Sequence, residues 1–235
     1  MLEIDSLSIG YGENVLIREF SLRLEDGECV LLAGRNGSGK SSLLRTLAGM
    51  QRAMKGSFHC SAGSIFVPTG TIRVKGFSVL DFLNTSSARE TRWGVSFDAA
   101  AAERSFRAME LLCILELADR DISTLSDGEF QKVCVASALA RLVTAGNGIS
   151  AGLLLLDEPS AFLDVDASSA LLETISDLAH SHGLTVLFSS HDIYAAMKYS
   201  DRVLSISSEG SVCLSGCGDR EKISALGRAF KQINK

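Results

Sequence analysis

The sequence predicts an α/β fold with a mainly parallel sheet and helices on both of its faces. Short apolar runs recur along the chain, as in strands that are buried on both faces of a sheet. Segments with apolar residues at helical spacing alternate with these runs, and this alternation favours parallel strands joined by helices. Residues 77–145 look mostly helical and are too long for a crossover, so we expect an inserted helical lobe. The buried strands are expected at residues 29–33, 153–156, 185–189 and 203–206.

The two ends of the chain predict further strands. Residues 2–9 and 20–24 alternate polar and apolar side chains, which indicates an N-terminal antiparallel β subdomain. A turn at Glu209 and Gly210 leads into a last hairpin strand at 211–214. We expect a single domain over 1–235, with the β subdomain and the first part of the core in 1–76, the helical lobe in 77–145 and the rest of the core in 146–235.

Composition excludes several classes of protein. With 46% apolar residues, 22% charged residues and two prolines among 235 residues, the chain is not disordered, collagen-like or a proline-rich linker. The net charge of −5 gives no reason to expect nucleic-acid binding. No apolar stretch approaches the roughly 18 residues of a membrane span, and the N-terminus lacks the features of a signal peptide, so we expect a soluble cytosolic protein. The six cysteines form no C-x-x-C pair and are expected to be reduced thiols.

A glycine-rich loop carries the strongest chemical signal. The segment from Gly34 to Ser41 fits the pattern G-x-x-x-x-G-K-[ST], between a predicted buried strand and a predicted helix at 42–50. Glycines let the backbone curl so that its N–H groups point at phosphate oxygens, and the helix N-terminus favours the same anion. Lys40 can reach the β- and γ-phosphates and the Ser41 hydroxyl can bind Mg²⁺, whereas the alternative is a glycine-rich turn that binds nothing. The predicted ATP-binding residues of this loop are Gly34, Arg35, Asn36, Gly37, Ser38, Gly39, Lys40, Ser41 and Ser42.

Two carboxylates follow the predicted strand at 153–156. Asp157 at the strand end suits a Mg²⁺ contact, and Glu158 is placed to polarise an attacking water. Pro159 disfavours helical dihedral angles at Glu158, so we expect the strand to persist through both carboxylates. The alternative is a plain acidic turn, against which the glycine-rich loop upstream argues. A GTPase would need an N/T-K-x-D guanine motif, which the sequence lacks.

The segment from Leu125 to Lys132 distinguishes among ATPases. It reads L-S-D-G-E-F-Q-K before a predicted helix and resembles the L-S-G-G-Q signature of ABC-transporter ATPases, with aspartate for the first glycine and glutamate for the glutamine. Ser126 also suits a helix N-cap, so a capping box is the alternative interpretation. The resemblance implies that this motif contacts a nucleotide held by a second cassette. Its residues are Ser126, Asp127, Gly128 and Glu129.

Other landmarks of the ABC-ATPase family follow in order over the whole chain. Tyr11 matches the aromatic residue that stacks on adenine, and Asp164, in S-A-F-L-D, matches the D-loop after the catalytic glutamate. His191 matches the switch histidine that contacts the γ-phosphate. Taken alone, Tyr11 could be an ordinary strand aromatic and His191 a structural histidine at a strand end. Together the matches imply a P-loop NTPase core with Lys40, Glu158 and His191 as catalytic residues.

One landmark of the family is missing. A glutamine usually follows a strand shortly before the helical lobe, but the matching segment reads I-F-V-P-T and has Thr69 at that position. A threonine oxygen can bind Mg²⁺, although its reach is about two bonds shorter than that of glutamine. We therefore treat Thr69 as a candidate metal ligand, directly or through water, beside Ser41 and Asp157.

The resemblance implies an ATPase that uses ATP and Mg²⁺ and works as a homodimer with two ATP molecules between its copies. It also implies integral-membrane permease subunits, a substrate-binding protein as an indirect partner, and a position on the cytoplasmic face of the membrane. The combination of S-D-G-E with D-E-P-S-A-F-L-D resembles most the subunits that drive iron–siderophore, haem and cobalamin import. The alternatives are an ABC ATPase that acts in cell division or at the ribosome, and a nucleotide-binding module with little turnover.

Overall fold

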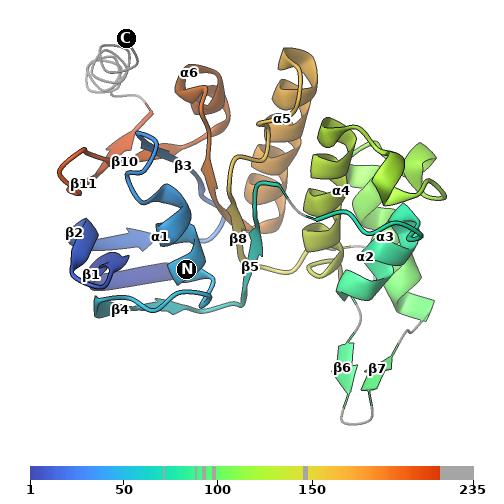
Figure 1. Cartoon of the computed structure of the whole chain (residues 1–235), viewed down its shortest axis with the longest axis horizontal. Helices are drawn as coiled ribbons and strands as arrows, with labels where there is room; N and C mark the ends of the chain where they lie inside the picture. The colour runs from blue at the N-terminus through green and yellow to red at the C-terminus, as the bar shows by residue number, and fades with distance from the viewer. Residues whose placement is uncertain (71, 88, 92–93, 97–98, 145–147, 218–235) are drawn as a thin grey trace.

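A six-stranded sheet forms the centre of the molecule (Figure 1). The computed structural model describes residues 1–70, 72–87, 89–91, 94–96, 99–144 and 148–217. The strands of the sheet are β3 (Cys29–Gly34), β5 (Ser64–Val67), β8 (Leu153–Leu156), β9 (Thr185–Ser189), β10 (Arg202–Ile206) and β11 (Val212–Gly216). Their order is β11-β10-β3-β9-β8-β5, and all neighbours are parallel except the hairpin of β10 and β11 at one edge.

The central strands are buried on both faces, as their apolar runs predict. Along β8, Leu154 and Leu156 belong to one hydrophobic cluster, while Leu153 and Leu155 belong to the other. Alternate side chains of a strand face opposite layers, so a strand between two layers needs a continuous apolar run. The prediction of a mainly parallel α/β core is confirmed.

A second, antiparallel sheet covers one face of the central sheet together with helix α1 (Lys40–Leu47) (Figure 1). It consists of β1 (Leu2–Tyr11), β2 (Asn14–Leu24) and β4 (Lys55–Cys60), in the order β2-β1-β4. Apolar side chains such as Leu2, Leu7 and Ile17 pack with α1 and the central strands in one cluster. The predicted N-terminal antiparallel sheet is therefore present.

Helices cover the opposite face and form a lobe beside it. Helix α5 (Val165–His182) packs against β3 and β9, and helix α4 (Asp127–Ala140) runs from the lobe to β5. The lobe is largely helical, as predicted, but it also carries a hairpin that the sequence analysis did not predict and that projects from it in Figure 1. Its other elements are α2 (Val79–Ser87), β6 (Arg89–Thr91), β7 (Gly94–Ser96), α3 (Ala99–Leu111), and the 3-10 helices η1 (Leu115–Leu117) and η2 (Ile122–Thr124).

Between β9 and β10 lie helix α6 (Ile193–Ala196) and the 3-10 helix η3 (Met197–Tyr199). Within the described ranges, none of the helices combines the length and the apolar character that crossing a membrane requires.

Candidate functional site

The glycine-rich loop joins β3 to α1 and borders a cavity of about 390 Å³. Gly37 and Gly39 have φ angles of 79° and 100°, a left-handed backbone that favours glycine. A Cβ on Gly34 would lie 2.4 Å from Ser38 Oγ, so a side chain there would displace the Ser38 hydroxyl. The predicted strand, loop and helix are therefore present, with the free N–H groups of α1 at the loop. The residues that line the cavity are Leu16, Arg35, Asn36, Gly37, Gly39, Lys40, Ser41, Ser42, Glu158 and His191.

Lys40 is held inside this loop. Its Nζ donates to the carbonyl oxygens of Gly34 at 2.8 Å and Arg35 at 3.2 Å, and the residue is only 7% exposed. Burial lowers the pKa of Lys40, while the nearby carboxylates of Glu158 and Asp157 act in the opposite direction. A buried ammonium requires negative charge close by, and phosphate groups in the cavity would supply it.

Ser189 connects the two carboxylates that follow β8. Its hydroxyl, at the end of the neighbouring strand β9, donates to Asp157 Oδ1 at 2.9 Å and accepts from the Glu158 backbone N–H at 2.9 Å. Asp157 is 6% exposed and Ser189 is fully buried. A buried carboxylate needs hydrogen-bond donors, and Ser189 supplies one to Asp157. Because the same hydroxyl also accepts the Glu158 N–H, it fixes the Asp157 side chain and the Glu158 backbone relative to each other.

The prediction that the strand continues through the carboxylates is wrong. β8 ends at Leu156, and Glu158 has a φ of 54°, in the left-handed region. This conformation is strained for a residue other than glycine, and it costs on the order of 1–3 kcal/mol. The local preference that Pro159 imposes is overridden by the hydrogen bond from Glu158 N–H to Ser189 Oγ. The resulting turn brings the Glu158 side chain to the cavity of the glycine-rich loop.

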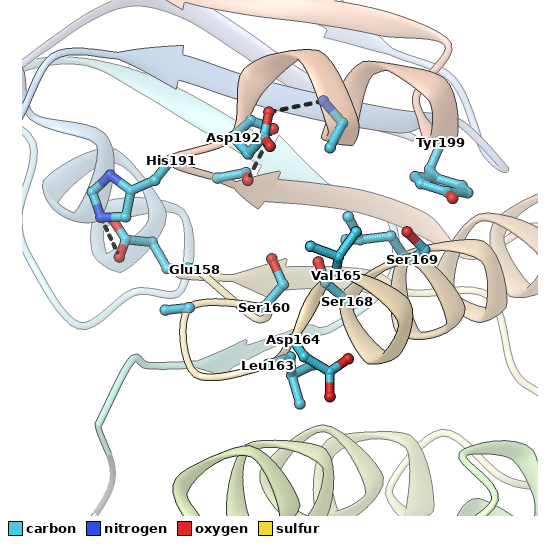
Figure 2. A pocket seen from close by; sticks show the side chains of 14 residues that line it. Glu158, Ser160, Leu163, Asp164, Val165, Ser168, Ser169, His191, Asp192 and Tyr199 are labelled. Atoms are coloured by element: carbon cyan, nitrogen blue, oxygen red, sulfur yellow. Dashed lines mark hydrogen bonds and ion pairs between the residues drawn. The ribbon is translucent and has the colours of Figure 1, made fainter.

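Glu158 and His191 both line this cavity. Figure 2 shows that their side chains face each other. His191 Nε2 lies 2.8 Å from Glu158 Oε2. His191 stands between β9 and α6, where Asp192 caps α6 by accepting the Ala195 N–H at 3.0 Å. The ends of β8 and β9 therefore bring a carboxylate and a histidine to the cavity that also contains Lys40.

The D-loop lies beside this pair and lines a second cavity, of about 220 Å³, between α5 and α6 (Figure 2). Asp164 ends this loop as the N-cap of α5 and accepts the Ala167 N–H at 2.8 Å. The same loop contacts the start of α4, because a Cβ on Gly128 would lie 2.9 Å from both Phe162 O and Leu163 Cδ2. The signature segment and the D-loop of one chain are therefore packed together.

Ser126 caps α4 within a complete capping box. Its hydroxyl accepts the Glu129 N–H at 3.2 Å, and its own N–H donates to Glu129 Oε2 at 2.8 Å. The Ser126 hydroxyl also donates to Glu129 Oε2 at 2.9 Å, and the two bonds that the carboxylate accepts, from the Ser126 N–H and hydroxyl, hold the pKa of Glu129 below its usual range. Residues 126–129 are not among the described residues that line the cavity of the glycine-rich loop.

Thr69 lies next to the carboxylates and is hydrogen-bonded to the backbone of Asp157. Its Oγ1 donates to the Asp157 carbonyl oxygen, and the Asp157 N–H donates to Val67 O at 2.9 Å. These bonds tie the segment that leaves β5 to the end of β8. A hydroxyl that donates its proton can still bind a metal through its lone pairs, so the metal role of Thr69 stays a prediction.

Tyr11 stands at the end of β1 and is 53% exposed. Its hydroxyl donates to Gln51 Oε1 at 2.9 Å and lies 3.1 Å from Ser42 Oγ, in the first turn of α1. Gln51 in turn donates from Nε2 to Gly10 O at 3.4 Å. The ring is thus anchored at its hydroxyl end and remains accessible for stacking on a base.

Comparisons with known proteins decide the family. Residues 17–161, more than half of the chain, match the family model described as ABC transporter. The chain belongs to the ABC transporter family. The zinc import ATP-binding protein ZnuC of Jannaschia sp. (strain CCS1) is 33% identical over 225 residues, which cover 92% of this chain and 82% of that protein. The petrobactin import ATP-binding protein FpuD of Bacillus anthracis is 27% identical over 87% of this chain and 77% of that protein.

A solved structure shares the fold of this ABC ATPase. It is described as a metal-chelate type ABC transporter in an inward-facing conformation, and it superposes with a TM-score of 0.83 at 24% identity, over 97% of this chain and 88% of that one. Likeness at this level of identity concerns the fold alone. The predictions of a P-loop NTPase fold and of an ATP-hydrolysing ABC ATPase are confirmed, while the roles of single site residues stay predictions.

Three residues of this ABC ATPase were missed by the sequence analysis. Ser189 looked like the end of an apolar run, although a hydroxyl at a strand end beside two carboxylates is itself a signal. Gln51 holds Tyr11, and no local pattern pointed to it. Arg73 contacts the signature segment, and the two acidic residues of that segment could have prompted a search for basic partners.

Proposed function

We propose that this chain is the ATP-binding and ATP-hydrolysing subunit of an ABC importer. The observation that supports it most is the convergence of Lys40, Glu158 and His191 on one cavity at the carboxyl ends of β3, β8 and β9. Ligands of open α/β sheets bind at this end of the strands. A buried lysine, a carboxylate that can accept a proton and a histidine are groups suited to transferring the γ-phosphoryl group of ATP to water.

Ser41, which lines the cavity, and Asp157 and Thr69, which lie beside its lining residue Glu158, fit a Mg²⁺ ion bound together with ATP. Asp157, fixed by Ser189, offers a carboxylate, and Ser41 and Thr69 offer hydroxyl groups. Proteins commonly hold Mg²⁺ through one or two carboxylates together with substrate phosphates. Within the described part of the chain, no group of three or more His, Cys, Asp or Glu could hold a metal by itself, which suits a site shared with the nucleotide. When bound, the ion would neutralise charge on the β- and γ-phosphates.

Glu158 is the general base in this proposal. Its carboxylate accepts a proton from water while the water oxygen bonds to the γ-phosphorus and the bond to the bridging oxygen of ADP breaks. Ser189 holds the Glu158 backbone in the strained conformation that directs this carboxylate to the cavity. His191 orients the carboxylate and contacts the γ-phosphate, and Lys40 pairs with the β- and γ-phosphates.

Two copies complete two sites in the proposed assembly. Residues 126–129 lie outside the residues that line their own chain's cavity, which supports a homodimer whose signature segments each contact the γ-phosphate of the partner's ATP. Tyr11 stacks on the adenine. Separate permease subunits provide the membrane pore, this subunit binds their cytoplasmic face, and a substrate-binding protein delivers the cargo.

The cargo that we propose is an iron–siderophore, haem or cobalamin-type compound. The motif D-E-P-S-A-F-L-D and the relative named for petrobactin import support this class. The relative named for zinc import is more similar in sequence, so zinc is the main competing cargo. Uptake of labelled zinc by the reconstituted transporter, without uptake of ferric siderophore, haem or cobalamin, would contradict the cargo and leave the ATPase assignment intact.

Glu158→Gln tests the ATPase assignment. With its permease bound, the variant should hydrolyse ATP at least about 100-fold more slowly, because general-base catalysis contributes about 10²–10⁴-fold. It should still bind ATP, and ATP should trap it as a dimer in size-exclusion chromatography. Glu173→Gln, on the exposed side of α5, is the matched control and should hydrolyse ATP at the wild-type rate. A wild-type protein that hydrolyses no ATP in the presence of its permease would overturn the proposal.

A further inference from the structure

Arg73 contacts the signature segment at three points. Its Nη1 donates to Leu125 O at 2.6 Å, its Nη2 forms an ion pair with Asp127, and its guanidinium lies 4.8 Å from the centre of the Phe130 ring. The Arg73 side chain is 25% exposed, whereas that of Asp127 is 69% exposed. A guanidinium presents its donors in a fixed plane, so this one residue holds a carbonyl and a carboxylate at once.

The chain around Arg73 is itself held in place. Gly76 N–H donates to Asp121 Oδ2 at 2.8 Å, and Ile122 N–H donates to Phe77 O at 2.9 Å. These bonds align the residues after Arg73 with the residues that precede the signature. The chain after Arg73 is therefore hydrogen-bonded to Asp121 and Ile122, just before the signature segment, while the arginine side chain contacts the signature segment itself.

Both acidic residues of the signature have an arginine partner. Asp127 pairs with Arg73, and Glu129 pairs with Arg120 at 2.8 Å. The L-S-G-G-Q signature has glycine and glutamine at these positions, so this chain adds two negative charges to a segment that would approach the phosphates of ATP. Like charges repel, and an unpaired carboxylate next to Ser126 would oppose that approach.

We propose that Arg73 is a positioning residue. It neutralises Asp127 and holds the signature segment in the conformation in which Ser126 can contact the γ-phosphate of the partner's ATP. The inference rests on the function proposed above and adds a neutralised charge pair, Arg73 with Asp127, at its dimer interface. Arg73 is not among the described residues that line its own chain's cavity. It therefore acts on ATP-dependent dimerisation and not on the binding of ATP to the monomer.

The test measures ATP-dependent dimerisation in the Glu158→Gln background, in which bound ATP persists. Arg73→Ala should raise the dimer Kd about tenfold, equivalent to about 1.4 kcal/mol, and leave the ATP affinity of the monomer unchanged. Arg73→Lys keeps the charge but loses the fixed plane of donors, so its dimer Kd should lie between that of the background and that of Arg73→Ala. Adding Asp127→Asn to Arg73→Ala should recover most of the loss, because the unpaired charge is then removed. The loss should also shrink at high salt, which screens exposed charges.

Controls separate this effect from misfolding and from failure of the proposed function. Arg23→Ala removes an exposed arginine ion pair on β2 and should leave the dimer Kd unchanged. If Arg73→Ala proves unfolded by thermal melting, Arg73→Gln takes its place in the same comparisons. An unchanged Kd in the folded variant, or a double variant no better than the single one, overturns the inference. A Glu158→Gln protein that forms no dimer with ATP refutes the dimer mechanism itself, and the inference with it.

Discussion

Ser189→Ala should lower the free energy of unfolding more than the same substitution at an ordinary buried serine would. The substitution removes the donation to Asp157 Oδ1 and leaves the Glu158 N–H without its acceptor, both at 2.9 Å in the native chain. A hydrogen bond to a charged group contributes about 1.5–3 kcal/mol, and an unsatisfied buried donor costs about 1–3 kcal/mol. Because the two effects share one hydroxyl and do not add fully, we expect the free energy of unfolding to fall by about 3 kcal/mol.

Activity should fall with stability. The hydroxyl of Ser189 holds the Glu158 backbone at a φ of 54°, and without it the strained turn can relax and move the carboxylate. Misplacement of a catalytic group by about 1 Å can cost about 100-fold, so we expect kcat to fall between about tenfold and 100-fold. Urea denaturation measures the first effect, and steady-state ATP hydrolysis measures the second.

Ser205→Ala is the matched control for this prediction. Ser205 is 4% exposed, lies on β10 of the same sheet, and donates to the neutral carbonyl oxygen of Cys213 at 3.1 Å. Its removal should cost about 1 kcal/mol and leave kcat unchanged. If Ser189→Ala loses no more stability than Ser205→Ala, or hydrolyses ATP at the wild-type rate, then Ser189 does not organise the two carboxylates.

Two further predictions concern Lys40 and Gly128. Burial lowers the pKa of Lys40 below 10.5, so the unfolded chain binds this proton more tightly, and the free energy of unfolding should rise with pH between the lowered pKa and 10.5. Lys40→Met should abolish ATP binding and remove this rise, which urea denaturation at several pH values measures. Equal pH slopes for the wild type and the variant would contradict the prediction. Gly128→Ala places a Cβ 2.9 Å from Phe162 O and Leu163 Cδ2, so it should reduce the free energy of unfolding by about 1–3 kcal/mol and weaken the ATP-dependent dimer. If the variant has the Tm of the wild type, the D-loop moves to accommodate the methyl group without cost and the prediction is wrong.

The central strands could be predicted because burial on both faces restricts the sequence so strongly. The predicted strands at 153–156 and 185–189 coincide with β8 and β9. The glycine-rich loop was predictable for a similar reason, since Gly37 and Gly39 adopt a backbone that other residues avoid. The hairpin of β6 and β7 was not, because three-residue strands contain too little alternation to be told from a helix or a loop.

The contacts that organise the site could not be predicted from local patterns. The residue before a proline normally stays extended, yet a hydrogen bond from another strand holds Glu158 in the left-handed region. Arg73 and Asp127 are far apart in the sequence and meet only because the lobe folds back on the segment after β5. Rules about neighbours in the chain describe the preferences of a segment, and tertiary hydrogen bonds and ion pairs decide whether those preferences prevail.

The close packing of Gly128 against the D-loop would couple the two ATP sites of the proposed dimer. Gly128 belongs to the segment that would contact the partner's nucleotide. Phe162, whose carbonyl oxygen leaves no room for a Cβ on Gly128, follows Glu158, the general base that we propose for the chain's own nucleotide. A displacement at one site therefore has to be accommodated at the other. Thermodynamic linkage makes such an influence reciprocal, so each ATP changes the affinity for the other by the same factor. The two ATP molecules would then bind to the dimer cooperatively.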